Sequence, residues 1–329
     1  DRRNGPVWVG RGRVLPVTRV AAIDCGTNSI RLLIADVAGG GLTDVVRRME
    51  IVRLGAGVDR TGMLDPMALE RTLEATRRYA AECREKGVER IRYVATSATR
   101  DAGNRQDFVD GVREAIGVEP EIISGDEEAT LSYLGATLVL TGQPEPVLVV
   151  DIGGGSTELV LGEAGSMIAG HSMDVGSVRM FERHLRSDPP TEPELAAARA
   201  DVRAMLDVAA TKVDLGATRT LVGLAGTITT LTGEVLGLDR YRPELINGAT
   251  MTIAQAQAAC DWYLHSTREE RLTRGYLHPG RVDVIAAGAL VWSEVMARVQ
   301  REVAARGGVL EHTTTSEHDI LDGIALSIA

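Results

Sequence analysis

Apolar residues along the chain form two stretches that repeat one pattern about a domain apart. The segment from Val20 reads VAAIDCGTNSIRLLIADV, and the segment from Val147 reads VLVVDIGGGSTELVLGE. In each, an apolar run ends in Asp, a turn rich in Gly and hydroxyl residues follows, and a second apolar run begins. Short apolar runs on either side of such a turn predict a β-hairpin. Because the pattern occurs twice, we expect two related domains whose turns face each other across a cleft.

Helix and strand patterns alternate in the rest of the chain, which is typical of an α/β fold. Asp65 and Pro66 form a favourable helix start, and apolar residues then recur at helical spacing. Further elements are predicted as helices over residues 105–116, 193–210, 253–265 and 282–304, and as strands near residues 90–95, 120–123 and 219–223.

The connector at residues 142–146, which reads GQPEP, is the natural boundary between the two domains. We therefore expect residues 19–141 to form the first domain and residues 142–311 to form the second. The segment 312–329 is expected to return to the first domain as a short helix. Residues 1–18 are expected to be a disordered extension.

The charge and composition limit the classes of ligand. The net charge is −10, which argues against DNA and general nucleic-acid binding, because such proteins rely on a basic field. A polyanionic substrate is still compatible with this negative net charge, since a local arginine cluster or a metal ion can reverse the electric field in one cleft. No apolar run reaches the roughly 18 residues that a membrane-spanning helix needs. Three widely spaced cysteines, Cys25, Cys83 and Cys260, are typical of a protein of the reducing cytoplasm.

The turn of the second repeat carries the pattern of a metal–phosphate site. Asp151 ends one strand, Glu158 opens the next, and the residues between them are Gly153, Gly154, Gly155, Ser156 and Thr157. Mg²⁺ prefers one or two carboxylates together with water and phosphate oxygens, and glycines let the backbone approach phosphates closely. Asp151 and Glu158 are therefore candidate ligands for Mg²⁺ or Mn²⁺. The alternative is a plain hairpin in which Asp151 only accepts hydrogen bonds from the turn.

Other segments could contribute anion-binding groups. The first turn offers backbone and side-chain donors, and a positive charge stands where the second turn has Glu158. A Gly-Thr turn opens a predicted helix near residue 226, and helix N-termini attract anions. The segment ATSATR follows a predicted strand, and further arginines could approach the cleft. The candidate substrate-binding residues in these segments are Gly26, Thr27, Asn28, Ser29, Arg31, Ser97, Arg100, Gly226, Thr227 and Arg281. For the arginines, a solvated surface position is the alternative.

The segment from Ser124, which reads SGDEEATLSYL, supplies a candidate general base. Ser124 and Glu127 have the spacing of a capping box, which gives Glu127 a local structural role. Glu128 is then free to orient and deprotonate a water molecule. From residue chemistry alone, a solvated glutamate in the first helical turn is the alternative.

As an ordered set, the segments IDCGTNSIRLL, YVATSATRDA, ISGDEEA, VVDIGGGSTELV, GSVRM, GLAGTITTL and RVDVIAAG resemble the exopolyphosphatase and guanosine pentaphosphate phosphohydrolase family. The resemblance covers about residues 19–329. It implies two ribonuclease H-like domains of the actin, Hsp70 and sugar-kinase superfamily. It also implies Glu128 as the catalytic base, Asp151 and Glu158 as metal ligands, and a homodimer as a common state.

The chain departs from longer members of that family in two respects. We therefore expect the short, two-domain form, which lacks the C-terminal HD-type helical region of longer members. Leu321 stands where many members carry an arginine, so a phosphate contact at that place is not expected. Polyphosphate and guanosine pentaphosphate are not distinguished as substrates by the sequence. A sugar or acyl kinase of the same superfamily, and a non-enzymatic actin-like filament or nucleotide sensor, are the competing interpretations.

Overall fold

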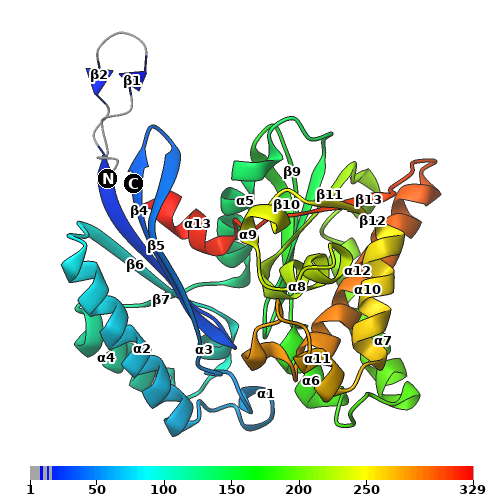
Figure 1. Cartoon of the computed structure of the whole chain (residues 1–329), viewed down its shortest axis with the longest axis horizontal. Helices are drawn as coiled ribbons and strands as arrows, with labels where there is room; N and C mark the ends of the chain where they lie inside the picture. The colour runs from blue at the N-terminus through cyan, green and yellow to red at the C-terminus, as the bar shows by residue number, and fades with distance from the viewer. Residues whose placement is uncertain (1–7, 10–12, 15–16, 329) are drawn as a thin grey trace.

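The computed structural model describes residues 8–9, 13–14 and 17–328, which form two halves, each built around one β-sheet (Figure 1). The first sheet has the strand order β5-β4-β3-β6-β7. Its strands are β3 (Thr18–Cys25), β4 (Ser29–Ala38), β5 (Gly41–Ile51), β6 (Arg90–Ala95) and β7 (Glu121–Ile122). The helices that follow these strands are α1 (Val58–Thr61), α2 (Pro66–Glu85), α3 (Ser97–Asp101) and α4 (Arg105–Ile116).

The second sheet has the strand order β10-β9-β8-β11-β13-β12. Its strands are β8 (Val147–Ile152), β9 (Thr157–Glu163), β10 (Ser166–Met173), β11 (Thr220–Leu224), β12 (Thr250–Thr252) and β13 (His312–Thr315). The helices of this half are α6 (Ser177–His184), α7 (Glu192–Ala210), α8 (Ala225–Val235), α9 (Pro243–Ile246), α10 (Ile253–His265), α11 (Arg268–Leu272) and α12 (Ile285–Ala305).

The two sheets repeat one topology. In each, three antiparallel strands (β3, β4 and β5, or β8, β9 and β10) are followed by a parallel strand (β6 or β11) beside the first of them. Each β-hairpin that the sequence predicts forms the first two strands of its sheet. The prediction of two related α/β domains is confirmed.

The central strand β3 is buried on both faces because its alternate residues pack in different directions. Ala21 and Ile23 belong to the apolar core that includes residues of α2 and α4. Val20 and Ala22 belong to a second core with Ile324 of helix α13 (Ile320–Ser327). This two-sided burial explains why the strand is a continuous apolar run in the sequence.

Helices α5 (Gly125–Leu140) and α13 cross each other at the junction between the halves. The crossing is close because each helix has a glycine at the contact. A Cβ atom on Gly323 would collide with the carbonyl of Leu131, and one on Gly135 would collide with the carbonyl of Asp319. Helix α5 also packs on β8, β9 and β10, so it contacts both halves and fixes the position of its own N-terminus between them.

Two predicted boundaries need correction. Residues 312–315 form β13, which pairs with β11 and β12 of the second sheet, so only α13 returns to the first sheet. Of the predicted extension, Trp8–Val9 and Arg13–Val14 pair as two short antiparallel strands and Thr18 begins β3, while residues 1–7, 10–12 and 15–16 lie outside the described residues. None of the described helices combines the length and the apolarity needed to cross a membrane.

Candidate active site

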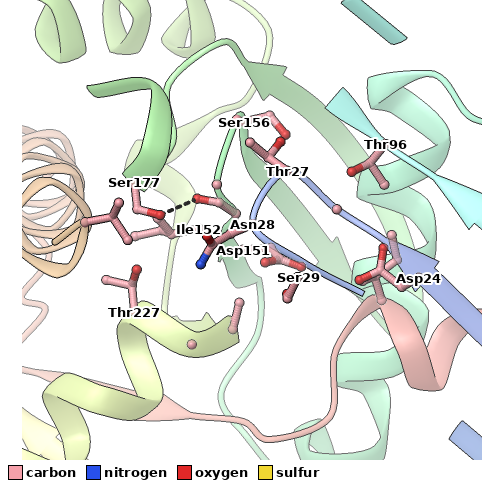
Figure 2. Close-up of a pocket in the computed structure, with 18 of the residues that line it drawn as sticks. Asp24, Thr27, Asn28, Ser29, Thr96, Asp151, Ile152, Ser156, Ser177 and Thr227 are labelled. Carbon is pink, nitrogen blue, oxygen red and sulfur yellow. Dashed lines mark hydrogen bonds between the residues drawn. The ribbon is translucent and has the colours of Figure 1, made fainter. Parts of the chain in front are cut away.

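The turns of the two hairpins meet at a cavity of about 90 Å³ between the halves (Figure 2). The N-terminal end of α8, the helical turn at Pro279–Arg281 and the first turn of α5 complete its wall. The predicted site residues that line it are Gly26, Thr27, Asn28, Ser29, Arg31, Glu128, Asp151, Gly153, Gly154, Gly155, Ser156, Glu158, Gly226, Thr227 and Arg281. Gly26 and Arg281, which are 255 residues apart in the chain, therefore meet at one cavity.

The second turn needs glycine because the first turn presses against it. A Cβ atom on Gly154 would lie 2.9 Å from Cβ of Thr27, and one on Gly155 would lie 2.6 Å from its Oγ1. Both distances are shorter than side chains tolerate. The glycines thus allow close approach of the two hairpins, and they carry no side chain that would keep a ligand away from the backbone.

Thr27 presents a polar group without a partner. Its Oγ1 atom is buried and makes no hydrogen bond within the part of the chain that the structure describes, although the residue lines the cavity. A buried hydroxyl usually finds a partner, because leaving it unpaired costs about 1–3 kcal/mol. A phosphate oxygen in the cavity would supply that partner.

Four carboxylates gather around the cavity, and all are buried: Asp24, Glu128, Asp151 and Glu158. Burial raises the pKa of Asp151 to about 7, and it raises the pKa of Glu158 above its ordinary value, an effect to which the charges of Glu128 and Asp151 add. Ser132 donates a hydrogen bond of 2.7 Å to Asp151, and Ser172 donates one of 2.7 Å to Glu158. Carboxylates that are buried this closely together are suited to holding a cation.

Asp151 and Glu158 are register partners in strands β8 and β9, so their side chains lie on the same face of the hairpin. They fit the one or two carboxylates that Mg²⁺ takes from a protein when phosphate oxygens and water complete its coordination. Among the described residues, no group of three or more His, Cys, Asp or Glu side chains is arranged to hold a metal by itself. A cation at this position would therefore take its remaining ligands from substrate phosphate and water.

Glu128 lies at the start of α5, with Arg100 behind it. Burial raises the pKa of Glu128 to about 7, and the nearby guanidinium opposes the rise. Nη1 of Arg100 donates to Oε2 of Glu128 at 3.1 Å and to the Ile123 carbonyl at 3.0 Å. Arg100 does not line the cavity, because it is turned toward the glutamate and away from the substrate space. Its position indicates that it orients Glu128.

Glu127 points away from the site. Its backbone N–H donates to Oγ of Ser124, so Ser124 caps the helix as predicted. A full capping box would also have the Glu127 carboxylate accept a hydrogen bond from the Ser124 backbone N–H. That part of the prediction is wrong, because the carboxylate instead pairs with Arg92 at 2.6 Å.

Arg31 is largely paired within the protein. Its guanidinium donates to Oδ2 of Asp24 at 2.9 and 2.6 Å, and it also pairs with Asp319 beside α13. It still lines the cavity, so it presents a positive surface whose charge is offset by two buried carboxylates. The alternative of a solvated arginine is wrong.

Arg281 is the more available positive group. Its guanidinium lies directly against Gly226, where a Cβ atom would collide with it. No hydrogen bond or ion pair of this side chain is found among the described residues, and burial lowers its pKa from the ordinary value. A partly buried guanidinium that is not engaged in an ion pair is suited to binding an anion.

Two further predicted residues lie outside the cavity. Thr157 is fully buried and donates to the Val175 carbonyl at 2.7 Å, because alternation along β9 turns it away from the face of Glu158. Ser97 accepts a hydrogen bond from Arg179 at 3.1 Å and lines a separate small gap behind the turns.

The sequence interpretation missed several residues of the wall, among them Asp24, Thr96 and Ser177 (Figure 2). It also missed Ala225. Asp24 was visible as the equivalent of Asp151 in the repeat. Ser177 is the second residue of the GSVRM segment. Ala225 has the left-handed backbone angle φ 68° at the sharp turn from β11 into α8, a feature for which the sequence carries no signal.

Comparisons with known proteins agree with this geometry. The model of the Ppx/GppA phosphatase family matches residues 33–315. The chain is 47% identical over 324 residues to exopolyphosphatase 2 of Mycobacterium tuberculosis, which covers 96% of this chain and 100% of that protein. It is 36% identical over 197 residues, or 60% of this chain and 39% of the relative, to a guanosine-5'-triphosphate,3'-diphosphate pyrophosphatase of Pseudoalteromonas atlantica.

A solved structure gives the same result at the level of the fold. The crystal structure of an exopolyphosphatase-like protein superimposes with a TM-score of 0.92 at 46% identity, covering 94% of this chain and 97% of the other. With the family model matched over most of its length, the chain belongs to the Ppx/GppA phosphatase family.

Proposed function

We propose that this protein hydrolyses the terminal phosphoanhydride bond of inorganic polyphosphate or of guanosine pentaphosphate and releases orthophosphate. The observation that carries the proposal is the position of Glu128. This buried carboxylate, with its pKa raised to about 7, faces the cavity where two glycine-rich turns and Arg281 offer a phosphate site. A general base works best when its pKa is near the operating pH.

In the proposed reaction, Glu128 takes a proton from a water molecule as the water oxygen bonds to the terminal phosphorus. The bond between that phosphorus and the bridging oxygen breaks, and the bridging oxygen stays on the shortened chain. Arg100 holds the Glu128 carboxylate in place through its 3.1 Å hydrogen bond. Phosphoryl transfer depends mainly on positioning and on neutralising charge, which the turn amides, Thr27 and Arg281 are placed to provide.

We further propose that Asp151 and Glu158 hold Mg²⁺ or Mn²⁺ together with substrate phosphate. When bound, the cation would offset the negative charge of the phosphates and of the two carboxylates. The supporting observation is the pair of facing, buried acids, which have raised pKa values and form no ion pair with any described residue.

A second hollow favours a nucleotide as one substrate. It has a volume of about 410 Å³ and shares Arg31, Gly226 and Arg281 with the catalytic cavity. Its wall includes Tyr241 and Tyr276, and ligand pockets commonly combine aromatic side chains with a few polar groups. A guanosine could occupy this hollow while its phosphates reach the catalytic cavity, whereas inorganic polyphosphate would use only the charged part of the wall.

A substrate panel tests these proposals. Orthophosphate release should be measured with short and long polyphosphate, guanosine pentaphosphate and ATP, with and without excess EDTA. We expect release from polyphosphate or guanosine pentaphosphate, and none in EDTA. ATP-dependent phosphorylation of a sugar or carboxylate acceptor would instead favour the kinase interpretation, and nucleotide-dependent sedimentation without turnover would favour the filament or sensor.

Two further expectations belong to this proposal. We place the protein in the cytoplasm, a reducing compartment, because Cys25, Cys83 and Cys260 are all buried and free. A homodimer stays a prediction, which analytical ultracentrifugation of the protein would test.

A further inference from the structure

A second line of cavities leads from the catalytic cavity toward α1 and α6. The catalytic cavity and a small gap of about 10 Å³ share Thr27 and Gly155 in their walls. The small gap in turn shares Asp59 and Glu182 with a wide surface hollow of about 660 Å³. Neither the small gap nor the wide surface hollow shares a wall residue with the 410 Å³ hollow. The catalytic cavity therefore has two sides, one wide and one almost closed.

Arg179 of α6 closes the narrow side. Its Nε atom donates to the carbonyl of Gly155 at 2.7 Å, which ties it to the phosphate-binding turn of the second half. Its terminal nitrogens donate to Asp59 at 2.6 Å and to Asp101 at 2.5 Å, both in the first half. One side chain, only 11% exposed, thus spans the junction between the halves at the narrowest point of the line of cavities.

The wall of the outer hollow includes two positive side chains that are not engaged in ion pairs with the described residues. Arg60 and Arg186 line it, and their side chains have no partner among the described residues. The acids of this region are engaged: Asp59 pairs with Arg179 and Arg183, and Glu182 accepts from the Gly57 amide at 2.9 Å. An anion that passed Arg179 would meet two unpaired guanidinium groups.

If the proposed function holds, a long substrate requires a separate route by which the released orthophosphate can leave. The wide side is the side with room for the remaining chain, so the terminal phosphate must lie at the inner end of the cavity. After each cleavage, the shortened chain still fills the wide side and blocks the new orthophosphate. We propose that orthophosphate leaves through the narrow side, past Arg179, and that Arg60 and Arg186 draw it into the outer hollow.

The test compares bond cleavage with the appearance of free orthophosphate. Cleavage of long-chain polyphosphate in a single turnover is measured by chemical quench, and free orthophosphate by a fluorescent phosphate-binding reporter. The first variant is the double substitution Arg60→Glu/Arg186→Glu. Its matched control is Arg219→Glu/Arg301→Glu, which makes the same charge change at two exposed arginines that line none of these cavities.

We expect Arg60→Glu/Arg186→Glu to slow the appearance of free orthophosphate about tenfold, at the lower end of what charge steering does to rates. Cleavage itself should not change, and the control should behave as the wild type. The same delay in the wild type and in the double variant would show that orthophosphate leaves by the wide side, and would overturn the proposal.

A second variant tests whether Arg179 controls the exit of orthophosphate or only supports the phosphate-binding turn. Asp101→Asn weakens the ion pair between Asp101 and Arg179 but leaves the hydrogen bond from Arg179 to the Gly155 carbonyl in place. Single-turnover cleavage should therefore be unchanged. If cleavage and release fall equally, Arg179 only supports the phosphate-binding turn, and the route is wrong. A wild-type protein that releases no orthophosphate from any phosphoanhydride would end the proposed function, and the exit route with it.

Discussion

Asp151 and Glu158 face each other across strands β8 and β9, at the register position where Asp24 faces Arg31 in the first hairpin. The same place in the repeat thus holds an ion pair in one half and two acids in the other. The first pair largely neutralises itself, whereas the second would place two like charges side by side once ionised, a repulsion that a bound cation would offset. Under the proposed function, the second pair would hold the cation and the first would lie beside the substrate.

The first prediction concerns Asp151→Asn. The amide keeps the shape and the contact with Ser132 but removes one charge from the facing acids. We expect turnover to fall and the Mg²⁺ concentration for half-maximal rate to rise by at least about tenfold. A magnesium titration of phosphate release measures both, and full activity of the wild type in excess EDTA would refute the metal site.

The second prediction concerns Glu128→Gln, which removes the basic oxygen but can keep the contact with Arg100. A positioned base contributes about 10²–10⁴-fold to a rate, so kcat should fall by that factor while KM changes little. Steady-state kinetics on the preferred substrate give both values.

The control for this variant is Glu127→Gln on the same helical turn. Its partner Arg92 is only 14% exposed but also pairs with Glu121, and Glu127 is 45% exposed. Loss of the partly exposed ion pair with Glu127 should therefore cost about 0–1 kcal/mol of stability. The control should keep normal kcat and almost normal stability. Near-normal kcat in Glu128→Gln, with chemistry shown to be rate-limiting, would mean that Glu128 is not the base.

The third prediction concerns pH and stability without metal. Folding raises the pKa of Glu128 and Asp151 to about 7, from about 4 in an unfolded chain. The folded state therefore binds more protons, and its stability should fall as pH rises from about 4 to about 7. Thermal unfolding in EDTA should show a lower Tm at pH 8 than at pH 5.5.

The stabilisation by added Mg²⁺ should depend on pH in the opposite direction. Because the cation requires ionised carboxylates, it should raise the Tm more at pH 8 than at pH 5.5. In Asp151→Asn this dependence on pH and on Mg²⁺ should be smaller. A Tm in EDTA that rises across this pH range would contradict the assignment.

The fourth prediction concerns Arg281→Ala. Hydrogen bonds to charged groups contribute about 1.5–3 kcal/mol, so substrate affinity should weaken roughly 10- to 100-fold and its dependence on salt should decrease. KM measured from 50 to 300 mM salt tests both. Arg77→Ala, at an exposed pair with Glu70 on α2, is the control and should leave KM unchanged.

Much of the architecture could be predicted from the chain alone. Two apolar runs around Gly-rich turns, repeated with the same position of Asp, are local patterns whose strand and turn preferences do not depend on distant partners. They indicated the duplicated fold and placed Asp151 and Glu158 on one hairpin. The helix start at Ser124 likewise directed attention to Glu128, because capping depends only on neighbouring residues.

The roles of the arginines were decided by the tertiary structure. Sequence reasoning treated Arg31 and Arg100 as free groups for the substrate, but Arg31 pairs with Asp319, 288 residues away, and Arg100 holds Glu128. Residues 312–315 joined the second sheet for the same reason: strand pairing is chosen among distant partners. Local patterns determined which elements form, whereas the long-range packing of those elements determined which charges remain unpaired at the cavity, because a flexible charged side chain takes its partner from whatever the fold brings beside it.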